Sequence, residues 1–317
     1  KALTLYDSTL TMPFSQRALA RLEPISFVLG WASEVDFVTS ASRHGHQVLC
    51  SDHVVNVPVY MNFAPPQEMK PKESRECPGA TDQHTVAFMF TDGDSITWDL
   101  GQFPSPDQNW WGHQERGRVP IAWTFQPALQ ELHPYFLQWV SKNATQNDAL
   151  LTGPSGAGYS YLDQYPHAKA REHFVNWTFA NMMRSPLLNM INQIQVRNYS
   201  DAFEMEVVWQ PHPPEAVFVD EELTLTIHGG VHMLGSTIVT SRRHALSKQF
   251  GDLTPEKLVK TLNAAPRDPH TSTSYSLVGV EVWSYGVSDI NAIASKLDAG
   301  VRVLPIDQYI SCLRQYV

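Results

Sequence analysis

The stretch Thr85-Val86-Ala87-Phe88-Met89-Phe90-Thr91-Asp92-Gly93-Asp94-Ser95 indicates how this chain is built. It opens with a run of apolar and β-branched residues, which is typical of a strand buried on both faces of a sheet. Two aspartates and a glycine follow at once. Ligand-binding groups of α/β proteins collect where parallel strands end, so the pattern predicts chemistry at Asp92 and Asp94.

Apolar runs of this kind alternate with helical patterns along most of the chain, which predicts repeated βα units and a parallel sheet. The predicted strands are 25–29, 47–49, 57–61, 85–90, 119–123, 149–151, 190–195, 216–219, 237–239, 277–282 and 301–304. The predicted helices are 35–42, 128–141, 168–183, 255–263, 288–297 and 307–315.

From this alternation we expect an α/β fold, a distorted TIM-like (β/α) barrel of seven or eight strands with a small N-terminal αβ appendage. Residues 1–62 would form the appendage and residues 84–317 the barrel-like domain. Residues 63–83 contain four prolines among charged residues and no apolar periodicity, so they predict a long surface excursion between the two.

The composition limits the classes of partner. The 317 residues are 43% hydrophobic, enough for a substantial core. A formal net charge of -9 without any lysine or arginine cluster argues against a nucleic-acid surface, which needs concentrated positive charge. No apolar run approaches the roughly 18 residues of a membrane span, so membrane insertion is not expected.

Three glycosylation sequons, at Asn143, Asn176 and Asn198, favour a secreted, extracellular glycoprotein. Asn143 and Asn198 lie in loop-like sequence, whereas Asn176 lies within a predicted helix. The chain begins at Lys1 without methionine or a signal peptide, so we expect either a processed mature protein or one part of a longer precursor. We predict a disulfide between Cys50 and Cys77, although three unpaired buried thiols are an equally good interpretation.

Three carboxylates are the predicted catalytic residues: Asp92, Asp94 and Glu281. Glu281 lies at the end of an apolar strand, where a glutamate is costly unless it faces a polar cavity or a partner. In a barrel, acids at the ends of different strands converge on one face, as the acid and base of a glycosidase do. The alternatives are a helix-capping role for an aspartate and a buried ion pair of Glu281 with Arg116 or Arg118.

Aromatic residues crowd the same strand ends, and rings that wall a cleft suit the apolar faces of a sugar. The predicted carbohydrate-binding residues are Trp98, Trp123, Gln126, Ser155, Tyr159, Tyr161 and Trp283. Trp123 could equally be a core residue. The neighbouring pair Trp110-Trp111 lies in a polar loop and is expected to be exposed or to line the pocket.

No cofactor or resident metal is predicted. His228 and His232 have the four-residue spacing of metal ligands only on a helix, and two glycines between them argue against one. Nothing in the sequence is similar to a P-loop, a nucleophile elbow or a dinucleotide fingerprint.

The segment Gly156-Ala157-Gly158-Tyr159-Ser160-Tyr161 resembles the naming motif of the GxGYxYP family of glycoside hydrolase-like proteins. The final proline of that motif is replaced by Leu162. The resemblance runs from about Ile25 to Tyr316, and it is carried by the following further residues: Gly30-Trp31 with Glu34, Ser51-Asp52, Asp92-Gly93-Asp94 with Trp98, Trp123 with Gln126 and Pro127, and Asn147-Asp148.

This resemblance implies a secreted or surface sugar-processing protein of barrel type, with a further domain before the segment present here. The resemblance supplies no established catalytic residue. From the resemblance and the strand-end acids together, we expect a glycoside hydrolase-like protein that cleaves a glycosidic bond with strand-end carboxylates. A non-catalytic extracellular glycan-binding or structural protein is one alternative, and a metal-dependent polysaccharide deacetylase-like enzyme is another.

Overall fold

The computed structural model describes residues 2–4, 13–23, 25–51, 56–63, 69–195, 209, 211–221, 230–249 and 253–317. These residues form a mixed α/β fold with one large sheet of ten strands and one small sheet of three. All strand neighbours are parallel except β9 and β10, as the βα alternation in the sequence predicted.

The large sheet has the strand order β11-β12-β4-β5-β6-β7-β8-β10-β9, and β13 adds to β4. Its strands are β4 (His84–Phe90), β5 (Ile121–Phe125), β6 (Asp148–Thr152), β7 (Met190–Gln195), β8 (Ala216–Glu221), β9 (Val231–Leu234), β10 (Thr237–Thr240), β11 (His244–Leu246), β12 (Tyr275–Val280) and β13 (Val301–Val303). Within the described residues no pairing joins β9 to β11, so the predicted closure into a barrel is not shown.

Strand β4 is the centre of the fold. All seven of its residues are buried, and one edge pairs with β12 from Thr85 to Phe90. The other edge is divided, because β13 pairs with its first three residues and β5 pairs with Met89 and Phe90. The carboxyl ends of β12, β4 and β5 therefore lie side by side, and the loops that follow these strands share one edge of the sheet.

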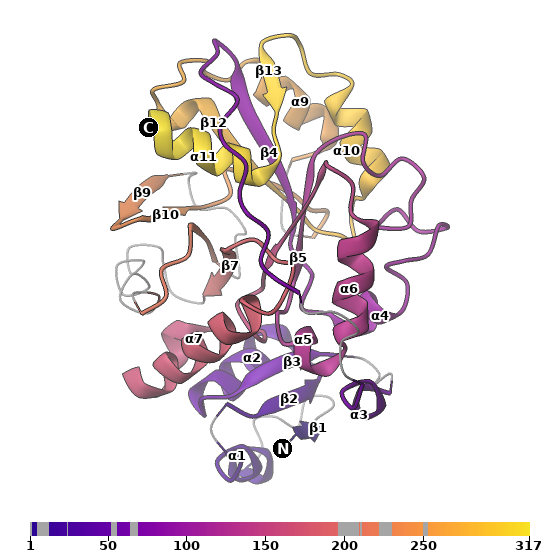
Figure 1. Cartoon of the computed structure of the whole chain (residues 1–317), viewed down its shortest axis with the longest axis vertical. Coiled ribbons are helices and arrows are strands. Elements are labelled where there is room, and N and C mark those ends of the chain that lie inside the picture. Colours follow the sequence, from indigo (N-terminus) through magenta and orange to yellow (C-terminus); the bar gives the residue numbers. More distant parts are fainter. Residues whose placement is uncertain are drawn as a thin grey trace.

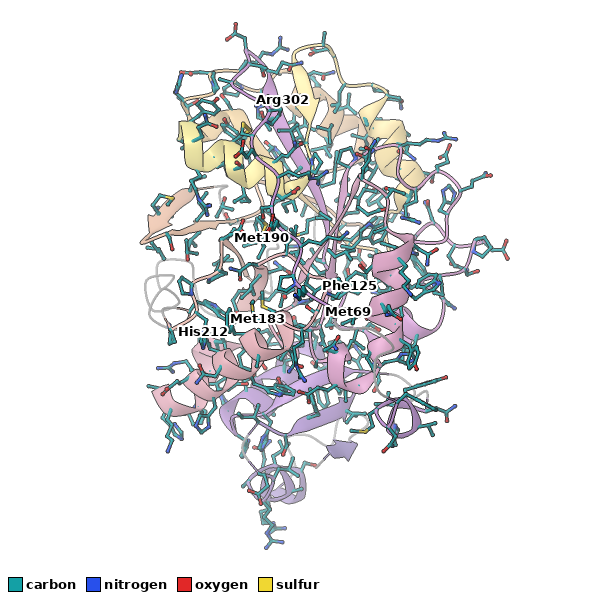
Figure 2. The ribbon with its side chains drawn as sticks, viewed as in Figure 1. Met69, Phe125, Met183, Met190, His212 and Arg302 are labelled. Carbon is teal, nitrogen blue, oxygen red and sulfur yellow. A yellow bond between two sulfur atoms is a disulfide. The ribbon has the colours of Figure 1, made fainter. Side chains whose placement is uncertain are left out.

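The small sheet contains β1 (Ala2–Thr4), β2 (Phe27–Gly30) and β3 (Gln47–Cys50). It lies at the lower end of the molecule in Figure 1, and β13 lies at the upper end. Arg302 of β13 is likewise far from it in Figure 2, whereas Phe125, the last residue of β5, lies near the middle. The small sheet therefore faces the carboxyl edge of the large sheet.

Backbone contacts join the two sheets. Val48 of β3 and Tyr159 exchange two hydrogen bonds, each with an N···O distance of 2.9 Å. Cys50, at the end of β3, forms a parallel bridge with Ser95 in the loop after β4. The N-terminal unit thus packs directly against the loops in which the sequence predicted chemistry.

The described helices include α1 (Pro13–Leu19), α2 (Glu34–Arg43), α3 (Val57–Tyr60), α4 (Ile96–Leu100), α5 (Leu129–Leu132), α6 (Pro134–Asn143), α7 (Ala168–Met182), α9 (Pro255–Asn263), α10 (Val287–Ala294) and α11 (Ile306–Tyr316), with short 3-10 helices η2 (Leu162–Gln164) and η4 (Ser272–Ser274). The predicted strand at 57–61 is wrong: Pro58 stands in the first turn of α3, where its missing N–H costs nothing. The predicted helix at 128–141 is divided, because His133 ends α5 and caps α6.

The predicted Cys50–Cys77 disulfide is also wrong, since Cys77 is bonded to Cys312, 235 residues further along the chain. Residues 75–80 run along α11, where Arg75 forms an ion pair with Asp307 and the Ala80 N–H donates to the Tyr316 hydroxyl, and this path carries Cys77 to the helix. Cys50 lies buried at the end of β3 and takes no part in the bond. Sequence spacing could not reveal this, because the pairing depends on where the extended segment packs.

In the part of the chain that the structure describes, no helix combines the length and the apolar character needed to cross a membrane.

Candidate active site

The loop after β4 is held against β5 by Gly93. A Cβ on Gly93 would lie 1.7 Å from the backbone oxygen of Thr124, so only glycine fits. The Gly93 N–H donates to Thr124 Oγ1 at 3.1 Å. Ser95 then caps α4, since its Oγ accepts from Trp98 N at 3.3 Å. These contacts fix the directions in which Asp92 and Asp94 leave the loop.

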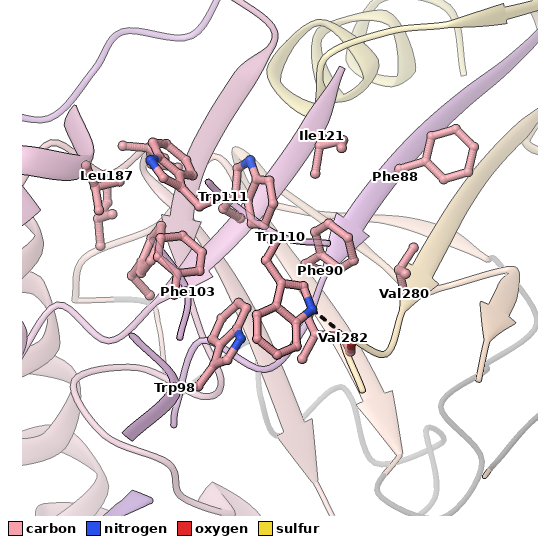
Figure 3. Close-up of a cluster of buried hydrophobic side chains, with 14 of the residues drawn as sticks. Phe88, Phe90, Trp98, Phe103, Trp110, Trp111, Ile121, Leu187, Val280 and Val282 are labelled. Atoms are coloured by element: carbon pink, nitrogen blue, oxygen red, sulfur yellow. Dashed lines mark hydrogen bonds between the residues drawn. The ribbon is translucent and has the colours of Figure 1, made fainter. Parts of the chain in front are cut away.

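The loop after β12 is joined to Asp92 by the backbone of Val282. Its N–H donates to Asp92 Oδ2 at 3.3 Å, and its carbonyl accepts a hydrogen bond of 3.0 Å from the indole Nε1 of Trp110. Figure 3 shows the second bond among the packed aromatic rings. The N–H of Val282 therefore joins the loop after β12 to the loop after β4, and its carbonyl joins the same loop to the aromatic cluster around Trp110.

Glu281 precedes Val282 and is 8% exposed. Ser247 Oγ donates to Glu281 Oε2 at 3.2 Å, and Ser284 Oγ donates to the same oxygen. The alternative ion pairs with Arg116 or Arg118 do not form, because those arginines are bound to Asp148 and Glu115. Glu281 is instead held by hydroxyl groups at the strand end.

Asp92 and Glu281 interact electrostatically. Burial raises the pKa of Asp92 from its ordinary value of 3.8 to about 6, and the charge of Glu281 acts in the same direction. Hydrogen bonds from Val282 and Thr91 and the charge of Arg242 oppose this rise in the pKa. The half-buried Asp92 therefore holds a proton in a pH range where an ordinary aspartate does not.

Asp94, the other predicted acid of this loop, is 7% exposed and interacts with a residue that the sequence analysis missed. This is Asp99 on α4, whose side chain is fully buried. Burial raises the pKa of Asp99 well above its ordinary value, and the charge of Asp94 raises it further. The sequence does carry a signal for Asp99, because this carboxylate lies between the apolar residues Trp98 and Leu100.

Among the predicted aromatic residues, Trp283 is 58% exposed and lies two residues after Glu281. Its ring centroid lies 5.7 Å from that of Trp110 and 6.4 Å from that of Trp98, both of which are buried. The buried rings of Trp98 and Trp110 thus pack against the exposed indole of Trp283. Trp110 and Trp111 were expected to be exposed or to line the pocket; they are buried, because both rings join the core around Phe103.

The other predicted sugar-binding residues are buried, which corrects the expected open aromatic wall. Trp123 is 1% exposed, and its Nε1 donates to Asp148 Oδ1 at 2.9 Å. Ser155 and Gln126 have no exposed surface. Ser155 Oγ accepts from Ile194 N at 3.2 Å, and Gln126 Nε2 donates to the Val48 carbonyl at 3.5 Å. These side chains support the strand ends.

The segment 156–161 fills the junction between the two sheets. A Cβ on Gly156 would lie 2.7 Å from the ring of Phe174, and one on Gly158 would lie 2.9 Å from Gln47 Cβ, so the glycines allow the layers to approach closely. Tyr159 and Tyr161 are 1% and 0% exposed and pack with the core of the small sheet. With so little exposed surface, neither ring offers a face on which a sugar can stack.

Tyr159 also ties the junction through its hydroxyl group, which donates to Glu34 Oε1 on α2 at 2.8 Å. Its ring stacks on Trp31 with a centroid distance of 6.4 Å. The Tyr161 N–H donates to Ser42 Oγ at 3.0 Å. The motif therefore fastens the N-terminal unit over the carboxyl edge of the large sheet.

Within the described ranges, no group of three or more histidine, cysteine, aspartate or glutamate side chains is arranged to hold a metal ion. His232 lies on the edge strand β9, and His228 falls outside the described residues. Of the sequons, Asn143 and Asn176 are exposed on α6 and α7, and Asn198 falls outside the described residues.

A search of the solved structures finds the same fold in a putative hydrolase from Bacteroides thetaiotaomicron, with a TM-score of 0.88 at 21% identity. The match covers 97% of this chain and 60% of that one, so the chain spans about three fifths of the relative's length. A putative polysaccharide deacetylase from Mycobacterium smegmatis matches with a TM-score of 0.43 and 10% identity, over 78% of this chain and 96% of that one.

No curated protein matches. Residues 1–62 match the family model of the GxGYxYP third domain. Residues 82–314 match that of the GxGYxYP putative glycoside hydrolase C-terminal domain, which is most of the chain. The protein therefore belongs to the GxGYxYP family.

Proposed function

We propose that this protein is a glycoside hydrolase in which Asp92 is the general acid and Glu281 the general base. The observation that carries the proposal is the hydrogen bond from Val282 N to Asp92, because Val282 directly follows Glu281 and the bond joins the two strand ends that carry these acids. Paired carboxyl groups with different environments are the usual machinery of glycosidic cleavage. The family description, which names a glycoside hydrolase domain, supports the same substrate class.

In the proposed reaction, protonated Asp92 donates its proton to the glycosidic oxygen as the bond from that oxygen to the anomeric carbon breaks. Glu281 accepts a proton from the water that attacks the anomeric carbon. The raised pKa of Asp92 suits a group that must be protonated at the start of the cycle. The exposed indole of Trp283 stacks on the sugar beside the pair.

A glycan panel tests the proposal with wild type, Asp92→Asn, Glu281→Gln and the control Asp107→Asn. Asp107 lies exposed in the loop after α4, away from the carboxyl pair in sequence. We expect each active-site substitution to lower kcat by about 10²-fold to 10⁴-fold, the usual contribution of general acid–base catalysis, and the control to have no effect. If wild type and both active-site variants hydrolyse the glycans at equal rates, neither Asp92 nor Glu281 has the proposed catalytic role.

The same panel separates the proposal from the alternative of a non-catalytic glycan-binding protein. Saturable binding of a glycan by wild type, with no product released, would favour the binding protein. Loss of that binding in Trp283→Ala would then place the ligand at the same strand ends.

We also propose that the protein is extracellular and that Asn143 and Asn176 carry glycans. The Cys77–Cys312 disulfide supports this, because such bonds persist in oxidising compartments. Both asparagines are exposed. Expression through a eukaryotic secretory pathway, followed by enzymatic deglycosylation, should shift the mass of wild type, and Asn143→Gln should lose part of that shift. An unchanged mass in wild type would contradict glycosylation.

A further inference from the structure

The two faces of the small sheet are covered differently. Val28 of β2 and Val48 of β3 share a core cluster with residues of α2, so this helix covers their face. Side chains alternate along a strand, which places Leu29 and its paired neighbour Leu49 on the opposite face. Parallel sheets are normally covered by helices on both faces. Here the second face forms the floor of a cavity of about 550 Å³.

The walls of this cavity come from α3, α5 and α7, which lie around the small sheet in Figure 1. Met61 directly follows α3, Leu132 ends α5, and Trp177 lies on α7. The ring of Trp177 packs against that of Phe27 on the floor, with a centroid distance of 4.9 Å. The volume is within the range of small-molecule sites, roughly 300 to 1,000 Å³.

The side chains that line the cavity offer little to a polar ligand. The hydroxyl group of Ser26 already donates to the Glu23 carbonyl at 2.6 Å. Among the described residues of the lining, the charged ones are Glu23 and Glu131, both acidic. Arg184 forms an ion pair with Glu131 at 3.0 Å, which offsets the attraction of that carboxylate for a cation. A sugar would lose its hydrogen bonds to water without replacing them, and an anion would be repelled.

We propose that this cavity is a binding site for a small neutral apolar molecule, either an alkyl chain or an aromatic compound. Such a ligand removes the apolar floor and walls from water, which is the driving force for its binding. It needs no hydrogen bond from the lining. Asp92, Glu281 and Trp283 do not line the cavity, so the inference is independent of glycosidic cleavage.

Titration with Nile red, a neutral dye that fluoresces strongly in apolar surroundings, tests the site in the whole chain. Met61→Trp places a larger side chain at the cavity. Val59→Trp is the matched control, because Val59 and Met61 are 55% and 51% exposed and Val59 does not line the cavity. We expect Met61→Trp to weaken dye binding about tenfold and Val59→Trp to stay within about twofold of wild type.

Thermal unfolding checks that both variants fold. Equal affinity of the two variants for the dye would overturn the proposal, because the dye would then lie outside the cavity.

Competition with alkyl compounds tests the chemical class on wild type alone. Below their micelle concentrations, octanol, decanol and dodecanol should displace the dye with an affinity that rises about fourfold for each added methylene, the equivalent of about 0.8 kcal/mol. Dodecanoate and dodecylammonium have the same chain with a negative or a positive head group. We expect both to compete at least about tenfold more weakly than dodecanol, since a charge must give up its hydration.

Three outcomes of the competition would contradict the proposal. Displacement by dodecanoate as strong as by dodecanol would show that the acidic lining does not select against anions. Tighter binding of dodecylammonium than of dodecanol would identify a site for cationic amphiphiles. Displacement by a short oligosaccharide, with none by the alcohols, would identify a sugar site.

Discussion

The pair of Asp92 with Glu281 predicts how the stability of the protein depends on pH. Asp92→Asn removes a group that titrates in the folded state at a pKa of about 6 and, in the unfolded chain, near the ordinary value of 3.8. Because the folded state holds the proton more tightly, Asp92 favours folding fully below about pH 3.8. This contribution is lost as the pH rises through about 6.

The size of the effect follows from the two pKa values. Each pKa unit corresponds to about 1.4 kcal/mol, so the rise from 3.8 to about 6 amounts to about 3 kcal/mol over the whole range. Integrated between about pH 4 and about pH 7.5, roughly 2 kcal/mol of this falls in an accessible window. The asparagine that replaces Asp92 does not titrate, so the variant should gain that much stability relative to wild type across the window.

Urea unfolding of wild type, Asp92→Asn and Asp107→Asn at several pH values measures the difference. Glu281→Gln should reduce the pH dependence of the protein, since the charge of Glu281 is the second cause of the raised pKa of Asp92. A stability difference between Asp92→Asn and wild type that stays constant from about pH 4 to about pH 7.5 would refute the reasoning. Asp92 would then titrate alike in the folded and unfolded chains.

Three further variants test the architecture of the protein. Replacing Cys77 and Cys312 by serine removes a covalent link across 235 residues and should lower the free energy of unfolding by about 4 kcal/mol, measured by urea unfolding. An unchanged urea midpoint would show that the disulfide constrains the unfolded chain little. Gly93→Ala places a methyl group against the Thr124 backbone and should lower the free energy of unfolding by about 3 kcal/mol and remove most of the activity. A fully active and equally stable variant would contradict this packing. Trp283→Ala should weaken glycan binding about tenfold, measured by titration calorimetry. The Tm should not fall, because Trp283 is 58% exposed. An unaltered affinity would place the ligand elsewhere.

The sequence located the acids correctly at strand ends but could not tell which acids meet. Asp92 and Val282 are 190 positions apart, and their hydrogen bond exists because β12 pairs with β4 from Thr85 to Phe90, which brings the two strand ends together. A local pattern also treats Asp92 and Asp94 alike. The fold separates them, since Asp92 accepts a hydrogen bond from Val282, whereas the charge of Asp94 raises the pKa of the buried Asp99.

The sequence was equally unable to predict which aromatic residues are exposed. Trp98, Tyr159 and Trp283 follow strand-like runs in similar polar surroundings, so the sequence offers no basis for ranking their exposure. Burial depends on which other elements arrive from elsewhere in the chain. The small sheet covers Tyr159, whereas the ring of Trp283 remains exposed at the edge of the Trp98–Trp110 cluster.

By itself the sequence determined the α/β class, most of the strands and helices, and the presence of carboxylates where β4 and β12 end, because each of these depends on apolar periodicity and on residues adjacent in the chain. Only the tertiary structure decided that Cys77 bonds Cys312, that Asp92 accepts a hydrogen bond from Val282 beside Glu281, and that the glycine-tyrosine segment joins the two sheets. These contacts link residues far apart in the chain, and they form only when the strand order and the packing of the layers bring those residues together.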